Sequence, residues 1–146
     1  MEGTIERIRV YPEKGSAGVD KAEARLVENS GLEGDFHAKG GDRQLSLLFA
    51  ETREQITEQK EKGLCFSRFK ENISVRGMPP NELRPGVLIE IGEAVLEVTG
   101  ETKYCHDECP LFEKGKTCAL TGTNLFARVL KSGVICTGQK LALKRV

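Results

Sequence analysis

The chain has 146 residues, with 22 basic and 22 acidic side chains, 38% hydrophobic residues and 5 cysteines. This length predicts a single domain over residues 1–146. The balanced charge, without clusters of Lys and Arg, argues against a nucleic-acid partner, and the lack of a long apolar run argues against a membrane. The N-terminus carries no secretory signal, so we expect a cytoplasmic protein. An odd number of cysteines in a reducing compartment favours metal binding or thiol chemistry over a disulfide framework.

The first third of the chain predicts strands separated by a glycine-rich loop. Thr4–Val10 alternates loosely at period two and ends before Pro12, and Ala22–Val27 is typical of a second strand. Asn29–Asp42 contains four glycines and is expected to be an ordered loop, the kind of segment that often carries function. Gln44–Phe49 is a short apolar run, which predicts a buried strand.

One helix is expected over Glu51–Lys62. The segment is rich in Glu, Gln and Lys, and Gly63 follows where a C-terminal cap belongs. Its apolar face consists of little more than Ala50 and Ile56. We therefore predict a surface helix on the outside of a β-rich core.

A strand and a hairpin follow this helix. Asn72–Arg76 predicts a strand, which the sequence Gly-Met-Pro-Pro then ends. Val87–Ile91 and Ala94–Val98 are two alternating runs, and the two-residue connection between them starts with Gly92. A glycine at that position favours a hairpin with a type II′ turn.

The last third changes character. Cys105–Thr123 is polar and aperiodic and is expected to form a loop over a site. Asn124–Lys131 predicts one or two helical turns stopped by Gly133, and Gly138–Leu143 alternates as a closing strand. The fold class predicted from these elements is mainly β: a barrel of mostly antiparallel strands with one surface helix and a few short helical turns.

The most distinctive chemical motif is the segment Cys105–Cys109, followed by Cys118. It places three thiols and the imidazole of His106 within fourteen residues. A thiolate suits transition metals, and it also suits sulfur transfer through a persulfide, because the thiolate rather than the thiol attacks sulfur. Lys103 and His106 lie close enough in sequence to lower the pKa of such a thiol.

A closed structural zinc site is the alternative interpretation of the same motif. Its candidate ligands are Cys105, His106, Cys109 and Cys118. The spacing differs from that of a standard zinc ribbon, which pairs two Cys-x-x-Cys turns. Cys65 and Cys136 stand alone among apolar neighbours and are interpreted as small core residues.

A second motif lies in the glycine-rich loop. Gly31–His37 allows the backbone to approach a ligand, and His37 with Arg43 offers donors for an oxyanion. The competing interpretation is a turn in which Asp35 bonds its own backbone and Arg43 pairs with it on the surface, and the spacing alone favours that turn. Further along, Asn72 and Arg76 on their own are ordinary exposed strand residues.

In their order along the chain, these segments resemble the MOSC (molybdenum cofactor sulfurase C-terminal) domain family, in its short stand-alone bacterial form. The matching motifs are Gly31–His37, Arg43–Leu48, Glu71–Gly77, Leu83–Gly86, Ile91–Gly100, Cys105–Cys109, Gly115–Cys118 and Phe126–Gly133.

The resemblance implies a compact β-barrel that handles sulfur and the molybdenum cofactor. It implies that Cys105 carries a persulfide sulfur or ligates molybdenum. Lys103 is expected beside that thiol, with Cys109 and Cys118 as resolving thiols or further ligands. The remaining motif positions are expected to line the pocket and hold anionic parts of the cofactor; they are Asp35, His37, Arg43, Asn72 and Arg76.

The chain departs from the family pattern at Asp42, where relatives often have a histidine, and this weakens an expected phosphate contact. The chain is also too short to hold a pyridoxal-phosphate desulfurase domain beside the barrel. Sulfur is therefore expected from a separate cysteine desulfurase, with molybdenum cofactor enzymes or biosynthesis proteins as acceptors. Two alternatives remain: a non-catalytic module stabilised by zinc, and, ranked last, a small molybdenum-dependent reductase.

Overall fold

The computed structural model describes residues 2–41, 44–52, 54, 71–78, 82–101 and 124–144. Within these residues the chain forms eleven strands. They are β1 (Glu2–Val10), β2 (Val19–Lys21), β3 (Glu23–Val27), β4 (Gly31–Leu32), β5 (Leu45–Phe49), β6 (Ile73–Arg76), β7 (Leu88–Ile91), β8 (Ala94–Glu101), β9 (Asn124–Lys131), β10 (Gly133–Cys136) and β11 (Lys140–Lys144).

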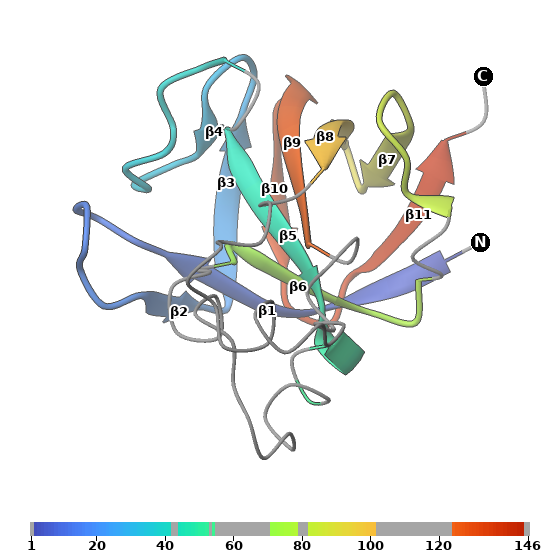
Figure 1. The fold of residues 1–146 in the computed structure, drawn as a ribbon, viewed down its shortest axis with the longest axis horizontal. Coiled ribbons are helices and arrows are strands. Elements are labelled where there is room, and N and C mark those ends of the chain that lie inside the picture. Colours follow the sequence, from blue (N-terminus) through green and yellow to red (C-terminus); the bar gives the residue numbers. More distant parts are fainter. Residues whose placement is uncertain are drawn as a thin grey trace, which may run out of the picture.

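Seven of the described strands close into a barrel. Their order is β11-β7-β8-β9-β5-β6-β1, and β1 pairs with β11 to complete the ring. Figure 1 shows this arrangement, with β2 added at the edge of β1 and a separate small sheet of β10, β3 and β4. Among the described pairings, β5–β6 is parallel and the others are antiparallel. The predicted fold class, a mainly β barrel of mostly antiparallel strands, is confirmed.

The core follows the period-two rule of strands, with one informative exception in β1. Ile5 and Ile8 are both fully buried although they lie three positions apart, a spacing that normally puts side chains on opposite faces. The register of β1 against β6 shifts between Ile5 and Arg7. This β-bulge turns Ile8 back to the inside. The loose alternation of the first strand thus has a structural cause.

The predicted hairpin is confirmed. β7 and β8 pair antiparallel, with Ile91 opposite Ala94 across the turn. Gly92 has a φ of 59°, whereas Glu93 has a negative φ. This combination fits a type II′ turn, in which only the first central residue needs the left-handed region.

The prediction of helical turns over Asn124–Lys131 is wrong, because this segment is strand β9. Leu125, Ala127 and Val129 are buried, whereas Phe126 and Arg128 between them are partly exposed, as expected for a strand with one face in the core. β9 lies between β5 and β8 and pairs with both. Pairing on both edges outweighs the helix propensity of Ala, Arg, Leu and Lys in this segment.

Gly133 does not stop a helix; it begins strand β10. A Cβ atom at this position would lie 2.7 Å from the backbone nitrogen of Ala94. The small sheet therefore approaches the start of β8 more closely than a side chain at residue 133 would allow. Strands β2, β4 and β10 are not predicted by the sequence patterns, and β2 and β4 are only three and two residues long.

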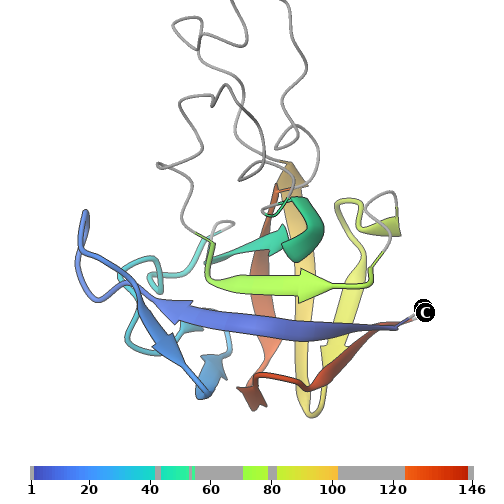
Figure 2. The ribbon, with the colours of Figure 1, turned by 90° about the horizontal axis from the view of Figure 1, so that it is seen from below.

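The predicted surface helix is described only at its start. Residues 50–52 and 54 are helical, and residues 53 and 55–70 lie outside the described part of the chain. In Figure 2 this helical turn lies at the end of the barrel where β8 ends and β9 begins. No helix among the described residues is long and apolar enough to cross a membrane.

Candidate functional site

A buried carboxylate lies at the centre of the polar residues that the glycine-rich loop contributes. The side chain of Asp35 has no exposed surface. Its Oδ1 accepts hydrogen bonds from the backbone nitrogen of Tyr11 at 2.8 Å and from Nδ2 of Asn72 at 3.0 Å. Its Oδ2 accepts from the backbone nitrogen of His37 at 3.0 Å and contacts Nδ1 of the same residue at 3.0 Å. Asp35 thus joins the loop to the end of β1 and the start of β6.

The pKa of Asp35 lies below its usual range. Burial raises this pKa, because the charged form loses its hydration. The hydrogen bonds from the His37 side chain and from the backbone nitrogens of Tyr11 and His37 lower it, and they outweigh the effect of burial. Asp35 is therefore ionised at neutral pH.

Asn72 is a buried connector rather than the exposed strand residue that its sequence context suggests. It is 1% exposed. Its Oδ1 accepts from the backbone nitrogen of Ser46 at 3.0 Å and from Oγ of Ser46 at 3.2 Å. Its Nδ2 donates to the carbonyl oxygen of Arg9 at 3.1 Å and to Asp35. All of its hydrogen-bonding capacity is used within the protein.

His37 differs from these neighbours because it reaches the surface. Its side chain is 37% exposed, and its ring lies 3.8 Å, centroid to centroid, from the ring of Phe36. An ionised carboxylate only accepts hydrogen bonds, so the contact with Asp35 requires a proton on Nδ1. Nε2 of the neutral ring is then an acceptor, and it has no partner among the described residues. We call Asp35, His37, Ser46 and Asn72 the Asp35 cluster.

The predicted turn at Asp35 is present in part. The carboxylate does bond its own backbone two residues on, at His37, as in an Asx turn. It is buried, however, and two of its hydrogen-bond partners, Tyr11 and Asn72, come from segments distant in sequence. Arg43, its expected surface partner, lies outside the described residues.

Arg76 lies apart from the Asp35 cluster. It follows Asn72 by four residues along β6, which is about 13 Å at roughly 3.3 Å per residue. Its guanidinium binds Glu6 through Nε at 2.7 Å and Nη2 at 3.1 Å, and it also pairs with Glu54. These two carboxylates raise the pKa of Arg76 above its ordinary value. Arg76 therefore connects β1 and β6 to the helical turn after β5.

Sequence reasoning missed two residues that organise this region. Gln44 is buried. Its Nε2 donates a hydrogen bond to the carbonyl oxygen of Gly41 at 3.0 Å, and its Oε1 accepts one from the backbone nitrogen of Val129 at 2.8 Å. Ser46 is buried against Asn72. The available signal was the alternation of Gln and Ser within an apolar strand, because a polar side chain in a buried run needs a hydrogen-bond partner.

The remaining predicted site residues lie outside the described part of the chain; they are Arg43, Lys103, Cys105, His106, Cys109 and Cys118. What the structure does fix is where their segment is attached. β8 ends at Glu101, β9 begins at Asn124, and Glu101 is opposite Leu125. Residues 102–123 thus leave and rejoin the barrel at neighbouring strand ends. Within the described residues, no group of three or more His, Cys, Asp or Glu side chains could hold a metal ion.

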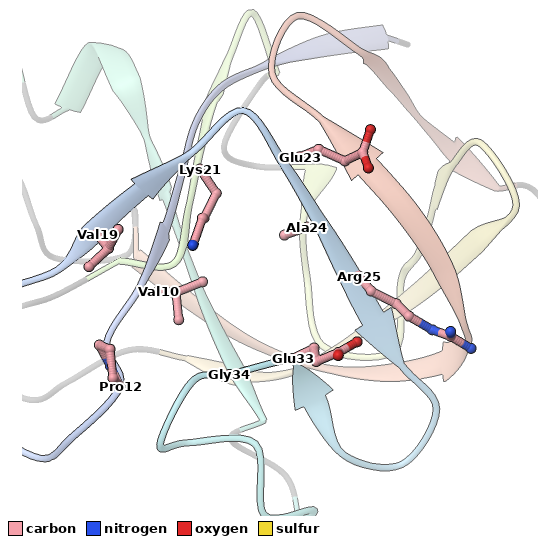
Figure 3. Close-up of a pocket in the computed structure, with 9 residues that line it drawn as sticks. All are labelled: Val10, Pro12, Val19, Lys21, Glu23, Ala24, Arg25, Glu33 and Gly34. Carbon is pink, nitrogen blue, oxygen red and sulfur yellow. The ribbon is translucent and has the colours of Figure 1, made fainter.

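A separate groove of about 450 Å³ lies between the β1–β2 ribbon and β3 (Figure 3). Lys21 points into it beside Val10, and Glu33 lies on the opposite side. None of the predicted site residues lines this groove, and its basic and acidic side chains are mixed. It gives no electrostatic preference for an anion. The lining residues are Val10, Pro12, Val19, Lys21, Glu23, Ala24, Arg25, Glu33 and Gly34.

Among the predicted site residues that the structure describes, only His37 has a side-chain nitrogen, Nε2, that is not already engaged, and it donates to an anion only when the ring is protonated. The side-chain polar atoms of Asp35 and Asn72 already form hydrogen bonds within the protein. The charge of Arg76 is paired with those of Glu6 and Glu54. A phosphate-bearing ligand needs cationic or N–H donors that are not already engaged. Contacts from Asp35, Asn72 and Arg76 to the molybdenum cofactor therefore receive no support from this geometry.

Comparisons with known proteins agree with the architecture. The family model described as "MOSC domain" matches residues 33–142. A search of curated proteins found no match. The YuaD protein from Bacillus subtilis has a similar structure, with a TM-score of 0.69 at 18% identity, over 97% of this chain and 94% of that one. YiiM from Escherichia coli is similar with a TM-score of 0.62 at 24% identity, over 100% of this chain and 71% of that one.

Proposed function

Because the chain belongs to the MOSC domain family, we propose that it is a sulfur carrier in molybdenum cofactor metabolism, with Cys105 as the persulfide-bearing thiol. The observation that carries this proposal is the family match over residues 33–142, which spans the thiol-rich segment after β8. A free thiol that is deprotonated near neutral pH is the group that sulfur transfer requires.

The other residues of that segment have supporting roles in this proposal. Lys103 and His106 favour the thiolate of Cys105 by placing positive charge near it. Cys109 and Cys118 act as resolving thiols or as further metal ligands. The segment joins the barrel at the paired ends of β8 and β9.

Binding of the molybdenum cofactor itself is the second part of the proposal. His37, Arg43 and the thiols would hold the molybdenum cofactor. The bound cofactor would supply a metal centre that accepts sulfur. Asp35 and Asn72 support such binding indirectly, by holding His37 in place. A separate cysteine desulfurase supplies the sulfur, and molybdenum cofactor enzymes or biosynthesis proteins receive it.

Intact-mass analysis of the full chain, purified without reductant, tests the role of Cys105. We expect an added mass of about 32 Da, one sulfur atom, that dithiothreitol removes, as a persulfide requires. Cys105→Ser should abolish it. The matched control is Cys136→Ser, because Cys136 is a partly buried free thiol in β10, and this variant should still carry the added sulfur.

Metal analysis of the same samples separates the proposal from its alternative. Stoichiometric zinc, with Cys105, Cys109 and Cys118 all protected from alkylation, would contradict the carrier role and identify a structural zinc site. Sulfur that is added equally to the wild-type chain and to Cys105→Ser would also contradict it.

A further inference from the structure

Strand β2 forms one end of the large sheet, and one of its edges is open. Its three residues, Val19, Asp20 and Lys21, are all exposed. It pairs with β1 on one side, and none of the described strands pairs with its other side. An open strand edge presents backbone N–H and C=O groups that can pair with a further strand.

The pairing of β1 shows which of its residues face β2. Arg9 donates its backbone N–H to the carbonyl oxygen of Asn72 at 2.7 Å, and its own carbonyl oxygen accepts from Nδ2 of Asn72 at 3.1 Å. The backbone groups of Arg9 are therefore directed toward β6. Since successive residues of a strand direct these groups to opposite edges, Ile8 and Val10 direct theirs toward β2.

The unpaired backbone groups of β2 belong to its central residue, Asp20. The first and last residues, Val19 and Lys21, lie opposite the two residues of β1 that face β2, so they direct their backbone groups toward β1. The N–H and C=O of Asp20 therefore point to the open edge. One residue of an added antiparallel strand can pair with both groups.

The groove between the β1–β2 ribbon and β3 lies on the face of β2 that carries Val19 and Lys21 (Figure 3). Val10 and Val19 are part of its apolar lining, and Val19 is 45% exposed. Lys21 points into the groove and forms no ion pair with another described residue. Because opposite side chains in a sheet share a face, an added strand would direct the side chains opposite Val19 and Lys21 to the groove side.

These features define the sequence that an added strand needs. In an antiparallel strand, the residue opposite Lys21 comes first, the residue opposite Asp20 second and the residue opposite Val19 third. The unpaired ammonium group of Lys21 favours an acidic side chain at the first position, and the surface of Val19 favours an apolar side chain at the third. Glu33, across the groove, disfavours a segment with many acidic residues.

Other occupants fit this surface less well. A small-molecule site buries most of its ligand, whereas Val10 is the only buried residue in the lining of this groove. A second copy of the chain would pair β2 with β2 around Asp20, and this pairing would place two carboxylates opposite each other. Nucleic acid needs a basic surface, and the groove has two acidic and two basic side chains.

We propose that the open edge of β2 and the adjoining groove bind an extended segment of a partner protein by strand addition. The segment runs antiparallel to β2 and has the pattern acidic–x–apolar. Its backbone pairs with Asp20, its acidic side chain lies against Lys21, and its apolar side chain lies against Val19. This interaction goes beyond the sulfur-carrier function and does not depend on it.

Hydrogen exchange measured by NMR on the full chain tests the open edge directly. The amide of Asp20 should exchange faster than the amides of Val19 and Lys21, because only the latter two are hydrogen-bonded to β1. The probe is the peptide acetyl-Thr-Val-Thr-Glu-Thr-Val-Thr-amide at millimolar concentration. It should slow exchange of the Asp20 amide on the order of tenfold.

N-methylated peptides distinguish strand addition from other modes of binding. The threonine that follows the glutamate donates its N–H to the carbonyl oxygen of Asp20, so methylation of this nitrogen should weaken binding on the order of tenfold. Methylation of the next residue, a valine whose N–H points away from β2, is the matched control and should be tolerated. Equal losses from the two methyl groups would overturn strand addition.

Substitutions in the protein test the sequence preference by fluorescence anisotropy of the labelled peptide. Lys21→Glu should weaken binding about fivefold and should favour a peptide with lysine in place of glutamate. Val19→Thr should weaken binding about threefold. Val134→Thr is its control, because Val134 is similarly exposed but lies on β10. Unchanged binding by Lys21→Glu, or an Asp20 amide that the peptide does not protect, would overturn the proposal.

Discussion

The side chain of Asp35 both connects segments of the fold and orients the ring of a predicted site residue, His37. Its two oxygens hold the end of β1, the start of β6 and the ring of His37. The sequence predicts Asp35 and His37 in one loop and Asn72 as a third site residue, with a local turn as the alternative. It could not show that the carboxylate is buried, because burial depends on contacts between segments that lie 24 and 37 positions apart.

The pKa of Asp35 leads to a prediction about acid stability. Because folding lowers this pKa, the ionised carboxylate stabilises the native state above the ordinary aspartate pKa of about 4, and this stabilisation is lost as the pH falls through the lower native value. Asp35→Asn should lower the free energy of unfolding at pH 7 by about 1–3 kcal/mol, since an amide cannot accept at both positions. Its stability should also depend less on pH below about pH 4. Urea unfolding at a series of pH values measures both effects.

Asp20→Asn is the control for this prediction. The hydrogen bond from Arg9 also lowers the pKa of Asp20, but that pair is largely exposed. Exposed ion pairs contribute little to stability, so Asp20→Asn should unfold nearly as the wild type does at pH 7. Equal losses in the two variants, or an unchanged acid sensitivity in Asp35→Asn, would contradict the role given to the buried carboxylate.

At the level of single elements, the sequence predicts secondary structure correctly where the local pattern is strong. It does not do so where pairing with other strands determines the structure. The β7–β8 hairpin could be predicted because Gly92 and two alternating runs specify it locally. β9 could not, because its composition favours a helix and only its two neighbours in the barrel make it a strand. The very short β2 and β4 give no periodicity to detect.

Gly133 offers a test of how the small sheet contacts the barrel. A Cβ at residue 133 would lie 2.7 Å from the Ala94 nitrogen and 3.0 Å from its Cβ, and backbone cannot yield as a flexible side chain does. Gly133→Ala should therefore lower the free energy of unfolding by about 1–3 kcal/mol, the usual cost of overpacking. Val134→Ala is the control on the same strand, since Val134 is 50% exposed and its truncation should change stability by less than about 0.5 kcal/mol. Urea unfolding of both variants would contradict this contact if Gly133→Ala were as stable as the wild type.

At the scale of the whole molecule, the barrel supplies fixed attachment points for the proposed chemistry. The Asp35 cluster ties the glycine-rich loop to β1, β5 and β6, while the ends of β8 and β9 anchor residues 102–123. The order of motifs along the sequence predicted the barrel and the family. It did not indicate that Arg76 pairs with Glu6 and Glu54, because those partners lie 70 and 22 positions away.

The most direct measurement of the central claim follows labelled sulfur from a cysteine desulfurase to this chain. The desulfurase is incubated with [³⁵S]cysteine and the full chain, and the label bound to the chain is measured on a non-reducing gel. We predict label on the wild type and on Cys136→Ser, its release by dithiothreitol, and no label on Cys105→Ser. Label that is absent from the wild type, or that persists on Cys105→Ser, would contradict the proposal that Cys105 carries sulfur.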